Sequence, residues 1–358
     1  MIKLAFFNSS ISWGGGEKWH MESALHFARL PNYKVFVFGD PNSELKKRIA
    51  SHPHITYIDF AVSNRSFLNP IKVNRLKSIF NTLSLDILVV NGSADIKIAA
   101  YAGHLSGTER IIYRRGSAIP IKNSAVNRYL FKNCISDVLA NSQETKKTIN
   151  MKYSQMFPLE KIKVIYNPIN TVPFQEKETK SEENDHIVIG NLARLAPQKN
   201  QTFLIDLSRE LSWRNIKHKI LIGGTGPLAQ ELEKYNKQSK TDKNVNFLGF
   251  VSDLDSFFNQ IDIFLLSSKW EGFGYVLAEA ALYRKPSIAF NVSSNRELVL
   301  HGETGYLVPY GNIDQTIEYI LSLGDQKTRD AFGHAGYRHV LKQFDQKVIY
   351  QQLEEFLR

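Results

Sequence analysis

Short apolar runs alternate with longer amphipathic segments along the first half of the chain. The apolar runs predict strands at Lys3–Phe7, Lys34–Phe38, Ile55–Asp59, Ile87–Val90, Arg110–Tyr113, Asp137–Ala140 and Lys163–Tyr166. The amphipathic segments predict helices at Glu17–Leu30, Ser43–Ser51, Ile71–Leu83, Ile96–His104, Ser124–Asn133 and Ser142–Met151. Continuous apolar strands that alternate with helices are typical of a parallel sheet covered on both faces. The pattern therefore predicts a doubly wound α/β domain.

A polar segment, Gln175–Asp185, interrupts this alternation and contains no apolar residue. It predicts a connection between two domains, with the boundary near residues 170–184. Strands are then expected at His186–Leu192, Lys217–Ile222, Val245–Leu248, Ile263–Leu266, Ser287–Phe290 and Tyr306–Val308. Helices are expected at Gln201–Leu211, Leu228–Gln238, Asp253–Asn259, Gly274–Tyr283, Ile313–Leu323 and Lys327–Gln343. Two doubly wound domains that face a central cleft would bind ligands at the carboxyl ends of their strands.

Composition agrees with a globular protein of two domains. The 358 residues are 43% hydrophobic and 22% charged, which indicates neither disorder nor a fibrous chain. Cys134 is the single cysteine and indicates a reducing compartment. The apolar run Leu4–Phe7 is too short for a signal peptide, and no stretch approaches the roughly 20 residues of a membrane span. A cytoplasmic location is expected.

The formal net charge of +10 favours anionic partners. The basic residues are spread along the chain, and no nucleic-acid-binding module is recognisable, so nucleic acid is not an expected partner. The charge is compatible with peripheral attraction to an anionic membrane surface, on its inner face.

Three loops after expected strands carry glycines or basic residues. Trp13–Glu17 opens a helix with three glycines, which would let backbone amides contact a phosphate or simply form a turn. Arg194 and Lys199 follow the first strand of the second half, where they could clamp a diphosphate or lie solvated. The turn Gly223–Pro227 either borders a ligand or is a tight turn.

The segment Glu271–Glu279 is the most informative. Gly272 and Gly274 permit unusual backbone conformations at a helix start, where exposed amides could hold a phosphate or sugar oxygen. Taken singly, Glu271 could instead be a helix-end charge and Glu279 a surface charge.

Together these motifs resemble the retaining family 4 glycosyltransferases of GT-B fold. The resemblance rests on Glu271 and Glu279 around their Gly-Phe-Gly core, on the segment from Gly190 to Lys199, and on the glycines before Glu17. It is strong over residues 186–310 and weaker over residues 1–170. It implies a domain of residues 1–172 that binds the acceptor and a domain of residues 173–342 that binds a nucleotide-sugar. Residues 343–358 would form a helix that returns to the first domain.

The resemblance also implies roles for individual residues. Arg194 and Lys199 would neutralise the leaving diphosphate, and Glu271 would hold hydroxyls of the transferred sugar without acting as a base. Contacts to the donor are implied for the following further residues: Gly15, Gly16, Phe250, Val251, Gly272, Phe273, Gly274, Tyr275, Val276 and Glu279. The activity implied is transfer of a sugar to an acceptor hydroxyl with retention of configuration. A glycan or lipid-linked sugar of a bacterial polysaccharide or lipopolysaccharide is the implied acceptor.

The sequence departs from the family at one position. The histidine that often follows the fifth strand is replaced by the pair Arg114 and Arg115. Either arginine could contact an anionic group of donor or acceptor, or both could be structural.

A few residues are compatible with other functions. Asp253 and Asp255 match a metal-binding Asp-x-Asp, but a helix cap explains them, and no His or Cys spacing fits zinc. We therefore expect neither a metal nor a cofactor. A sugar-nucleotide epimerase or another GT-B enzyme, and a non-catalytic anion-binding protein, are the alternatives.

Overall fold

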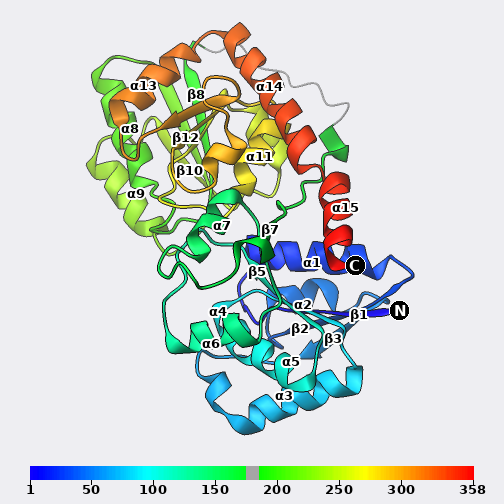
Figure 1. The fold of residues 1–358 in the computed structure, drawn as a ribbon. Helices are drawn as coiled ribbons and strands as arrows, with labels where there is room; N and C mark the ends of the chain where they lie inside the picture. The colour runs from blue at the N-terminus through cyan, green and yellow to red at the C-terminus, as the bar shows by residue number, and fades with distance from the viewer. Residues whose placement is uncertain (175–184) are drawn as a thin grey trace. The chain divides into compact units, whose positions relative to one another are not determined.

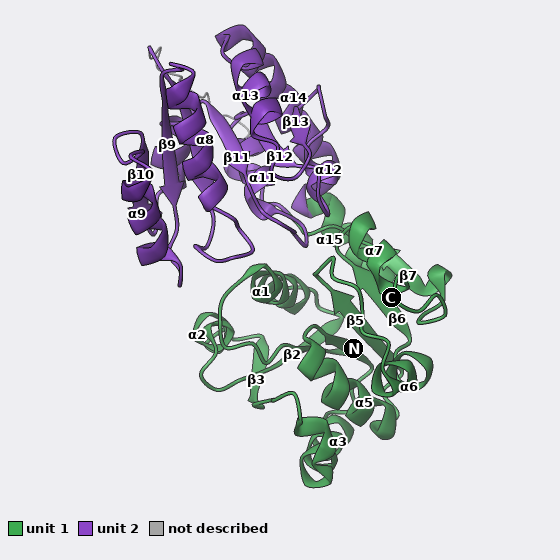
Figure 2. Cartoon of the chain, turned by 90° about the vertical axis from the view of Figure 1, so that its left-hand side faces the viewer, with its two compact units in different colours: residues 1–168, 347–358 green, residues 169–346 purple. Residues whose placement is uncertain are grey.

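The computed structural model describes residues 1–174 and 185–358, and these form two α/β units (Figures 1 and 2). Unit 1 contains Met1–Pro168 and Lys347–Arg358, and unit 2 contains Ile169–Gln346. These divisions lie four residues from the expected domain limits at 172/173 and 342/343. Residues 175–184 of the expected connection lie outside the described residues.

Unit 1 is built on a parallel sheet with the strand order β3-β2-β1-β4-β5-β6-β7. Its strands are β1 (Ile2–Phe7), β2 (Tyr33–Gly39), β3 (Ile55–Asp59), β4 (Ile87–Val90), β5 (Arg110–Arg115), β6 (Asp137–Ala140) and β7 (Ile162–Val164). The central strand β1 pairs with β2 through Phe7 and Phe38 and with β4 through Phe7 and Val90. Strand order reverses beside β1, which is the place where ligands bind in doubly wound sheets.

Both faces of this sheet are covered by helices. They are α1 (Gly15–Ala28), α2 (Glu44–Ile49), η1 (Ser66–Leu68), α3 (Pro70–Leu83), α4 (Ser93–Asp95), η2 (Ile96–Ala100), α5 (Tyr101–Ser106), α6 (Ala125–Asn133), α7 (Gln143–Ile149) and η3 (Leu159–Lys161). Ser43, Asn69, Ser124 and Ser142 begin α2, α3, α6 and α7 by accepting a backbone N–H. The single helix expected at Ile96–His104 is instead a π-helical turn, η2, between α4 and α5.

Adjacent residues of β1 show why its apolar run is continuous. Phe7 stacks on Phe38 at a ring distance of 5.5 Å on one face, and Phe6 packs edge-on against Trp19 at 6.1 Å on the other. Successive strand residues point to opposite faces, so both must be apolar when both faces are covered. The α1 face also receives α15 (Gln346–Leu357) from the far end of the chain, through Leu353 and its neighbours.

Unit 2 repeats this architecture with the parallel order β10-β9-β8-β11-β12-β13. Its strands are β8 (Ile187–Leu192), β9 (His218–Gly223), β10 (Val245–Gly249), β11 (Ile263–Leu266), β12 (Ser287–Phe290) and β13 (Gly305–Val308). Its helices are η4 (Val172–Phe174), α8 (Thr202–Trp213), α9 (Ala229–Gln238), α10 (Leu254–Asn259), α11 (Tyr275–Leu282), α12 (Asn295–Leu298), α13 (Ile313–Ser322) and α14 (Gln326–Phe344). Here the strand order reverses between β8 and β11, and the loops after these two strands carry the predicted site.

The helices of the described residues include none that is long and apolar enough to cross a membrane.

Candidate active site

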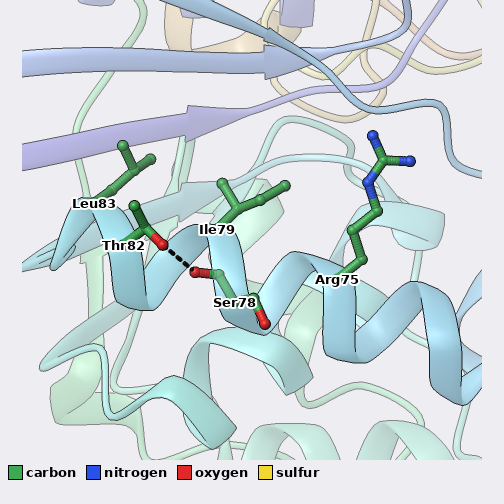
Figure 3. Close-up of a pocket in the computed structure, with 5 residues that line it drawn as sticks. All are labelled: Arg75, Ser78, Ile79, Thr82 and Leu83. Carbon is green, nitrogen blue, oxygen red and sulfur yellow. Dashed lines mark hydrogen bonds between the residues drawn. The ribbon is translucent and has the colours of Figure 1, made fainter.

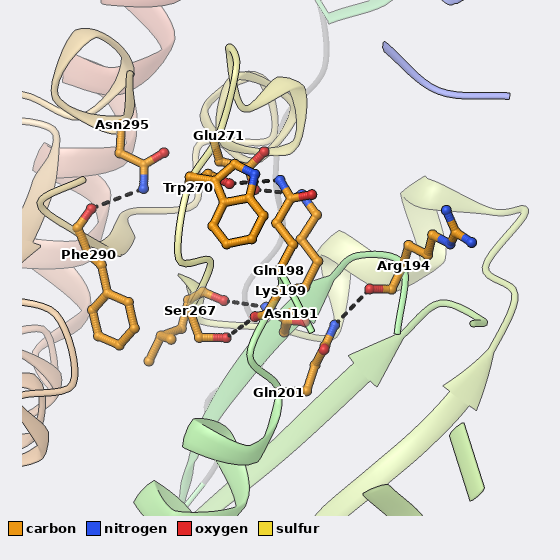
Figure 4. A network of polar contacts seen from close by, with 11 residues as sticks. Asn191, Arg194, Gln198, Lys199, Gln201, Ser267, Trp270, Glu271, Phe290 and Asn295 are labelled. Carbon is orange, nitrogen blue, oxygen red and sulfur yellow. Dashed lines mark hydrogen bonds and ion pairs between the residues drawn. The ribbon is translucent and has the colours of Figure 1, made fainter. Parts of the chain in front are cut away.

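Lys199 and Glu271 meet at the carboxyl edge of the unit 2 sheet. Lys199 lies on the loop after β8, Glu271 on the loop after β11, and Lys199 Nζ donates to Glu271 Oε1 at 2.5 Å (Figure 4). The side chains are only 20% and 8% exposed. The structure thus brings two predicted site residues together as a largely buried ion pair.

Three further hydrogen bonds join the same two loops. Gln198 Nε2 donates to the Trp270 carbonyl oxygen at 2.7 Å, and the Lys269 amide donates to the Gln198 carbonyl oxygen at 2.8 Å. Ser267 Oγ donates to the Lys199 carbonyl oxygen at 2.9 Å. These contacts fix the backbone on both sides of the ion pair. The sequence prediction missed Gln198 and Ser267. Gln198 directly precedes the predicted residue Lys199, and Ser267 directly follows the end of β11.

Arg194 occupies a different place on the loop after β8. Its side chain is exposed, and in Figure 4 the guanidinium extends away from the Lys199–Glu271 pair. Its carbonyl oxygen accepts a hydrogen bond from Gln201 Nε2 at 3.1 Å, which anchors the backbone at this point. Arg194 and Lys199 therefore carry their charges at separate points along one loop.

The start of α11 has the backbone that the glycines predict. Gly274 precedes the helix with φ at +86°, a left-handed conformation that favours glycine. A Cβ at Gly274 would also lie 3.3 Å from Leu298 Cδ1. The first backbone N–H groups of the helix, including those of Tyr275 and Val276, have no acceptor within the helix and can face an anion. Gly272 and Glu279 are partly exposed in the same region.

Phe273 has a structural side chain. It is 3% exposed and packs edge-on against Phe344 at 5.4 Å. Only its backbone is suited to contact a ligand. By contrast, Phe250 on the loop after β10 is 79% exposed, and its neighbour Val251 is half-buried. An exposed aromatic ring at the carboxyl edge of a sheet is suited to stack on a planar ligand group.

The loop after β12 and the first residue of α12 add polar atoms that the sequence prediction missed. Asn295 Nδ2 donates to the Phe290 carbonyl oxygen at 3.0 Å (Figure 4). Asn295 Oδ1 and Ser294 Oγ are buried and have no hydrogen-bond partner among the described residues. Asn295 Oδ1 lies 3.7 Å from the position of a Cβ at Gly274. Unpaired buried polar atoms call for an explanation, such as a ligand or ordered water. The sequence does contain a sign of these polar atoms, because three polar residues starting at Ser293 follow shortly after the end of β12.

Arg114 lies at the corresponding edge of unit 1, beside the glycine loop. It is 2% exposed, its Nη2 donates to Asn167 Oδ1 at 2.8 Å, and its Nη1 donates to Asn91 Oδ1 at 3.3 Å. Its guanidinium also lies over the Trp19 ring, 4.9 Å from the centroid. A Cβ at Gly16 would lie 2.9 Å from Asn91 Nδ2 and 3.8 Å from Arg114 Nη1. A side chain at position 16 would therefore force the Asn91 amide to shift. Gly15 is the first residue of α1.

His20 is a buried neighbour of this arginine. Its Nδ1 lies 3.0 Å from the Gly16 carbonyl oxygen, while its Nε2 has no hydrogen-bond partner among the described residues. Burial, followed by the positive charge of Arg114, lowers the pKa of His20 to about 3. His20 is thus neutral at physiological pH, and the positive charge here belongs to Arg114.

Arg115 points to the other face of the sheet. Its Nη1 donates to Tyr113 Oη at 3.0 Å and its Nη2 to the Ile119 carbonyl oxygen at 2.5 Å. Strand residues alternate between faces, so Arg114 lies on the α1 side and Arg115 on the α6 side. The structure therefore places only Arg114 beside Gly16.

The side chains of Asp253 and Asp255 both make structural hydrogen bonds. Asp253 Oδ1 accepts the Ser256 amide at 3.0 Å and caps α10, and Asp255 accepts a hydrogen bond from Tyr283 Oη. The interpretation of Asp253 as a helix cap is confirmed. The part of the chain that the structure describes contains no group of three or more His, Cys, Asp or Glu side chains placed to hold a metal ion.

Sequence comparison identifies the half of the chain that carries the ion pair. Residues 173–339 match the family model described as Glycosyl transferases group 1. This segment is a glycosyltransferase group 1 domain. The glycosyltransferase domain thus includes both loops of the Lys199–Glu271 pair and the start of α11.

Two bacterial glycosyltransferases are similar to this chain in sequence. The capsular polysaccharide biosynthesis glycosyltransferase CapM of Staphylococcus aureus is 30% identical over 233 residues, which are 62% of this chain but only 61% of CapM. An Escherichia coli UDP-Gal:alpha-D-GlcNAc-diphosphoundecaprenol alpha-1,3-galactosyltransferase is 25% identical over 337 residues, covering 85% of this chain and 84% of the relative.

Solved structures show the fold of the whole chain. Anabaena HepE in complex with UDP has a TM-score of 0.83 at 22% identity, and the match covers 99% of each chain. The apo form of the lipopolysaccharide outer core galactosyltransferase WaaB has a TM-score of 0.77 at 21% identity, covering 99% of this chain and 98% of WaaB. The prediction of an α/β chain of GT-B type with two Rossmann-like domains is confirmed.

Proposed function

We propose that the chain is a retaining, metal-independent glycosyltransferase that moves a sugar from a nucleotide-sugar to an acceptor hydroxyl in the synthesis of a bacterial surface polysaccharide or lipopolysaccharide. The observation that carries this proposal is the Lys199–Glu271 pair beside the start of α11, within a glycosyltransferase group 1 domain. A UDP-sugar is the first candidate donor, since HepE was solved with UDP and UDP-glucose.

In the proposed reaction the bond between the sugar's anomeric carbon and the diphosphate breaks, and a bond to the acceptor oxygen forms on the same face. The acceptor proton passes to the leaving diphosphate. Lys199 and Arg194 offset the negative charge that develops on this group, which is the main contribution of the protein to the rate. Glu271 holds both Lys199 and a sugar hydroxyl, and is a positioning residue.

Other contacts follow from where the side chains lie. The amides of Gly274, Tyr275 and Val276 would hold a phosphate or sugar oxygen at the start of α11. The exposed ring of Phe250, next to Val251, would border the base, and Glu279 the ribose. In unit 1, Gly15 and Gly16 would admit a phosphate, and Arg114 would contact an anionic group of donor or acceptor. A glycan or lipid-linked sugar is the proposed acceptor.

A donor screen tests the proposal. The purified chain is mixed with UDP-, GDP-, ADP- and CMP-sugars in the presence of a chelator, and both thermal stabilisation and nucleotide release are recorded. We expect one donor to stabilise the protein and to release nucleotide, with both effects lost in Lys199→Ala. The control is Lys269→Ala, which removes an exposed charge from the loop after β11.

Two outcomes would argue against the proposal. No response to any donor, or an equal response in Lys199→Ala and the control, would exclude this edge as the donor site. An altered sugar formed without acceptor would indicate an epimerase instead.

A further inference from the structure

An aromatic hollow lies on unit 1, and none of its lining residues has been assigned a role above. It has a volume of about 360 Å³ and joins residues of η1, η2, α5 and α6. Its lining residues are Phe67, Lys97, Tyr101, Ala125, Val126, Tyr129 and Leu130. The side chains are mainly apolar, yet Tyr129 is 47% and Val126 37% exposed. Lys97 is the one charged group among these lining residues, and its Nζ lies 5.7 Å from the centroid of the Phe67 ring.

The surface beside the hollow exposes further large apolar side chains. Leu68 at the end of η1 is 67% exposed, and Ile71 in the first turn of α3 is 79% exposed. One helical turn further along α3, Arg75 projects from a shallow second hollow of about 450 Å³, shown in Figure 3. Neighbouring exposed apolar groups of this kind mark an interaction surface.

The charge of the chain is concentrated in the same segment. Residues 61–135 contain eleven Lys or Arg against three Asp or Glu, a net +8, whereas the rest of the chain has thirty-four against thirty-two. Of the three acidic residues, Asp95 is buried at 2% exposure. Lys72 lies on α3, which follows η1, Lys122 lies just before α6 and Arg128 lies on α6; Lys122 and Arg128 are exposed. Basic residues are therefore enriched in the same stretch of unit 1 that carries the exposed apolar side chains.

The π-helical turn η2 is the second unusual feature at this place. Such turns are rare and occur frequently at functional sites. Here it carries Lys97 into the lining of the hollow. The elements concerned follow β3, β4 and β5, so the face borders the carboxyl edge of the sheet that also carries Gly16 and Arg114.

We propose that this aromatic–basic face docks the protein on an anionic lipid bilayer. The face comprises Phe67, Leu68, Ile71, Lys72, Lys97, Tyr101, Lys122, Val126, Arg128 and Tyr129. Basic side chains are attracted to anionic headgroups, and aliphatic and aromatic side chains enter the interface between headgroups and chains. Docking here would bring the edge with Arg114 toward an acceptor held in the membrane. That consequence rests on the proposed function, whereas membrane binding itself does not.

Sedimentation with vesicles tests the proposal without any donor. The wild-type chain is mixed with vesicles rich in phosphatidylglycerol or made of phosphatidylcholine alone, and the partition coefficient is measured. One variant combines Leu68→Ser, Ile71→Ser and Tyr129→Ser, and a second combines Lys72→Gln, Lys97→Gln, Lys122→Gln and Arg128→Gln. The control variants carry their substitutions at exposed positions on unit 2. The control for the apolar variant combines Trp213→Ser with Leu321→Ser. The control for the basic variant combines Lys219→Gln, Lys234→Gln, Lys237→Gln and Lys243→Gln.

We expect strong binding to the anionic vesicles only, at least ~10-fold weaker in both face variants and unchanged in both controls, because one basic residue near such a surface strengthens binding about fivefold. Thermal melting establishes that the variants are folded, and light scattering reports their oligomeric state. Equal binding to both vesicle types, equal loss in the controls, or face variants that bind like the wild type would overturn the proposal. So would a dimer that only the face variants disrupt, which would assign the face to a second copy of this chain.

Discussion

Replacing Glu271 by glutamine keeps the size of the side chain and removes the charge that pairs with Lys199. Both side chains are largely buried, at 8% and 20% exposure. A hydrogen bond between charged groups contributes about 1.5–3 kcal/mol to stability, and we expect the free energy of unfolding of unit 2 to fall by this amount. Since each 1 kcal/mol shifts the melting temperature of a domain this size by roughly 2–4 °C, the expected loss is about 3–12 °C.

A double-mutant cycle isolates the pair from other effects of the substitution. Glu271→Gln and Lys199→Met are made singly and together, and unfolding is followed in urea. The control cycle uses Asp185 and Lys217, which form an ion pair of 2.8 Å at the surface of the same unit with side chains over 70% exposed. We expect clear coupling for the buried pair and none beyond error for the exposed pair. Equal coupling in the two cycles would refute the structural role of the buried pair.

Nucleotide binding by the same variants separates the roles of the two residues. In Glu271→Gln the ammonium group of Lys199 loses its carboxylate partner and keeps its charge. UDP should therefore bind at least as tightly as in the wild type, while sugar transfer is impaired. Lys199→Met should weaken UDP binding about tenfold, or ~1.4 kcal/mol. Calorimetric titration measures both affinities, and a larger loss in Glu271→Gln would show that the carboxylate, and not the lysine, supports the nucleotide.

Three further predictions concern individual positions. Gly274→Ala should destabilise unit 2 by about 1–2 kcal/mol, because φ is +86° at this residue, and thermal unfolding with and without UDP would measure the effect. Phe250→Ala should weaken UDP binding without changing the melting temperature of the unliganded protein, since its ring is 79% exposed; an unchanged affinity would remove Phe250 from the proposed site. His20 has a pKa of about 3 in the folded chain against 6.5 as its ordinary value. Stability should therefore fall below pH 6.5, by up to about 1.4 kcal/mol per pH unit, until about pH 3. In His20→Phe the free energy of unfolding, measured in urea at pH 7 and pH 5, should depend less on pH than in the wild type. An unchanged pH dependence would contradict the assignment of this effect to His20.

The elements of the fold were predictable because both sheets are buried on both faces. Strands such as β4 and β11 are short, wholly apolar runs, and their predicted bounds coincide with the structure. The π-helical turn η2 was not predictable, since its sequence has ordinary helical periodicity. The helix α12 was missed because its four residues are too few to show any period.

The candidate site was predictable in its residue types and not in its contacts. Lys199 and Glu271 are 72 residues apart, and their meeting depends on β8 and β11 being neighbours in the sheet. The choice between Arg114 and Arg115 follows from strand alternation only when the face covered by α1 is known. The unpaired atoms of Ser294 and Asn295 depend on side-chain orientation, which no spacing in the sequence indicates.

Unit 1 is assembled from two stretches of chain that are separated by the whole of unit 2. Ile349, Leu353 and Leu357 of α15 are each about 1% exposed in the unit 1 core, and His26 stacks on Tyr350 at a ring distance of 4.0 Å. During synthesis on the ribosome, unit 2 is therefore the first unit whose sequence is complete. The first Rossmann-like sheet must wait with an uncovered apolar patch until α15 has emerged, which reverses the usual order in which the amino-terminal domain matures first.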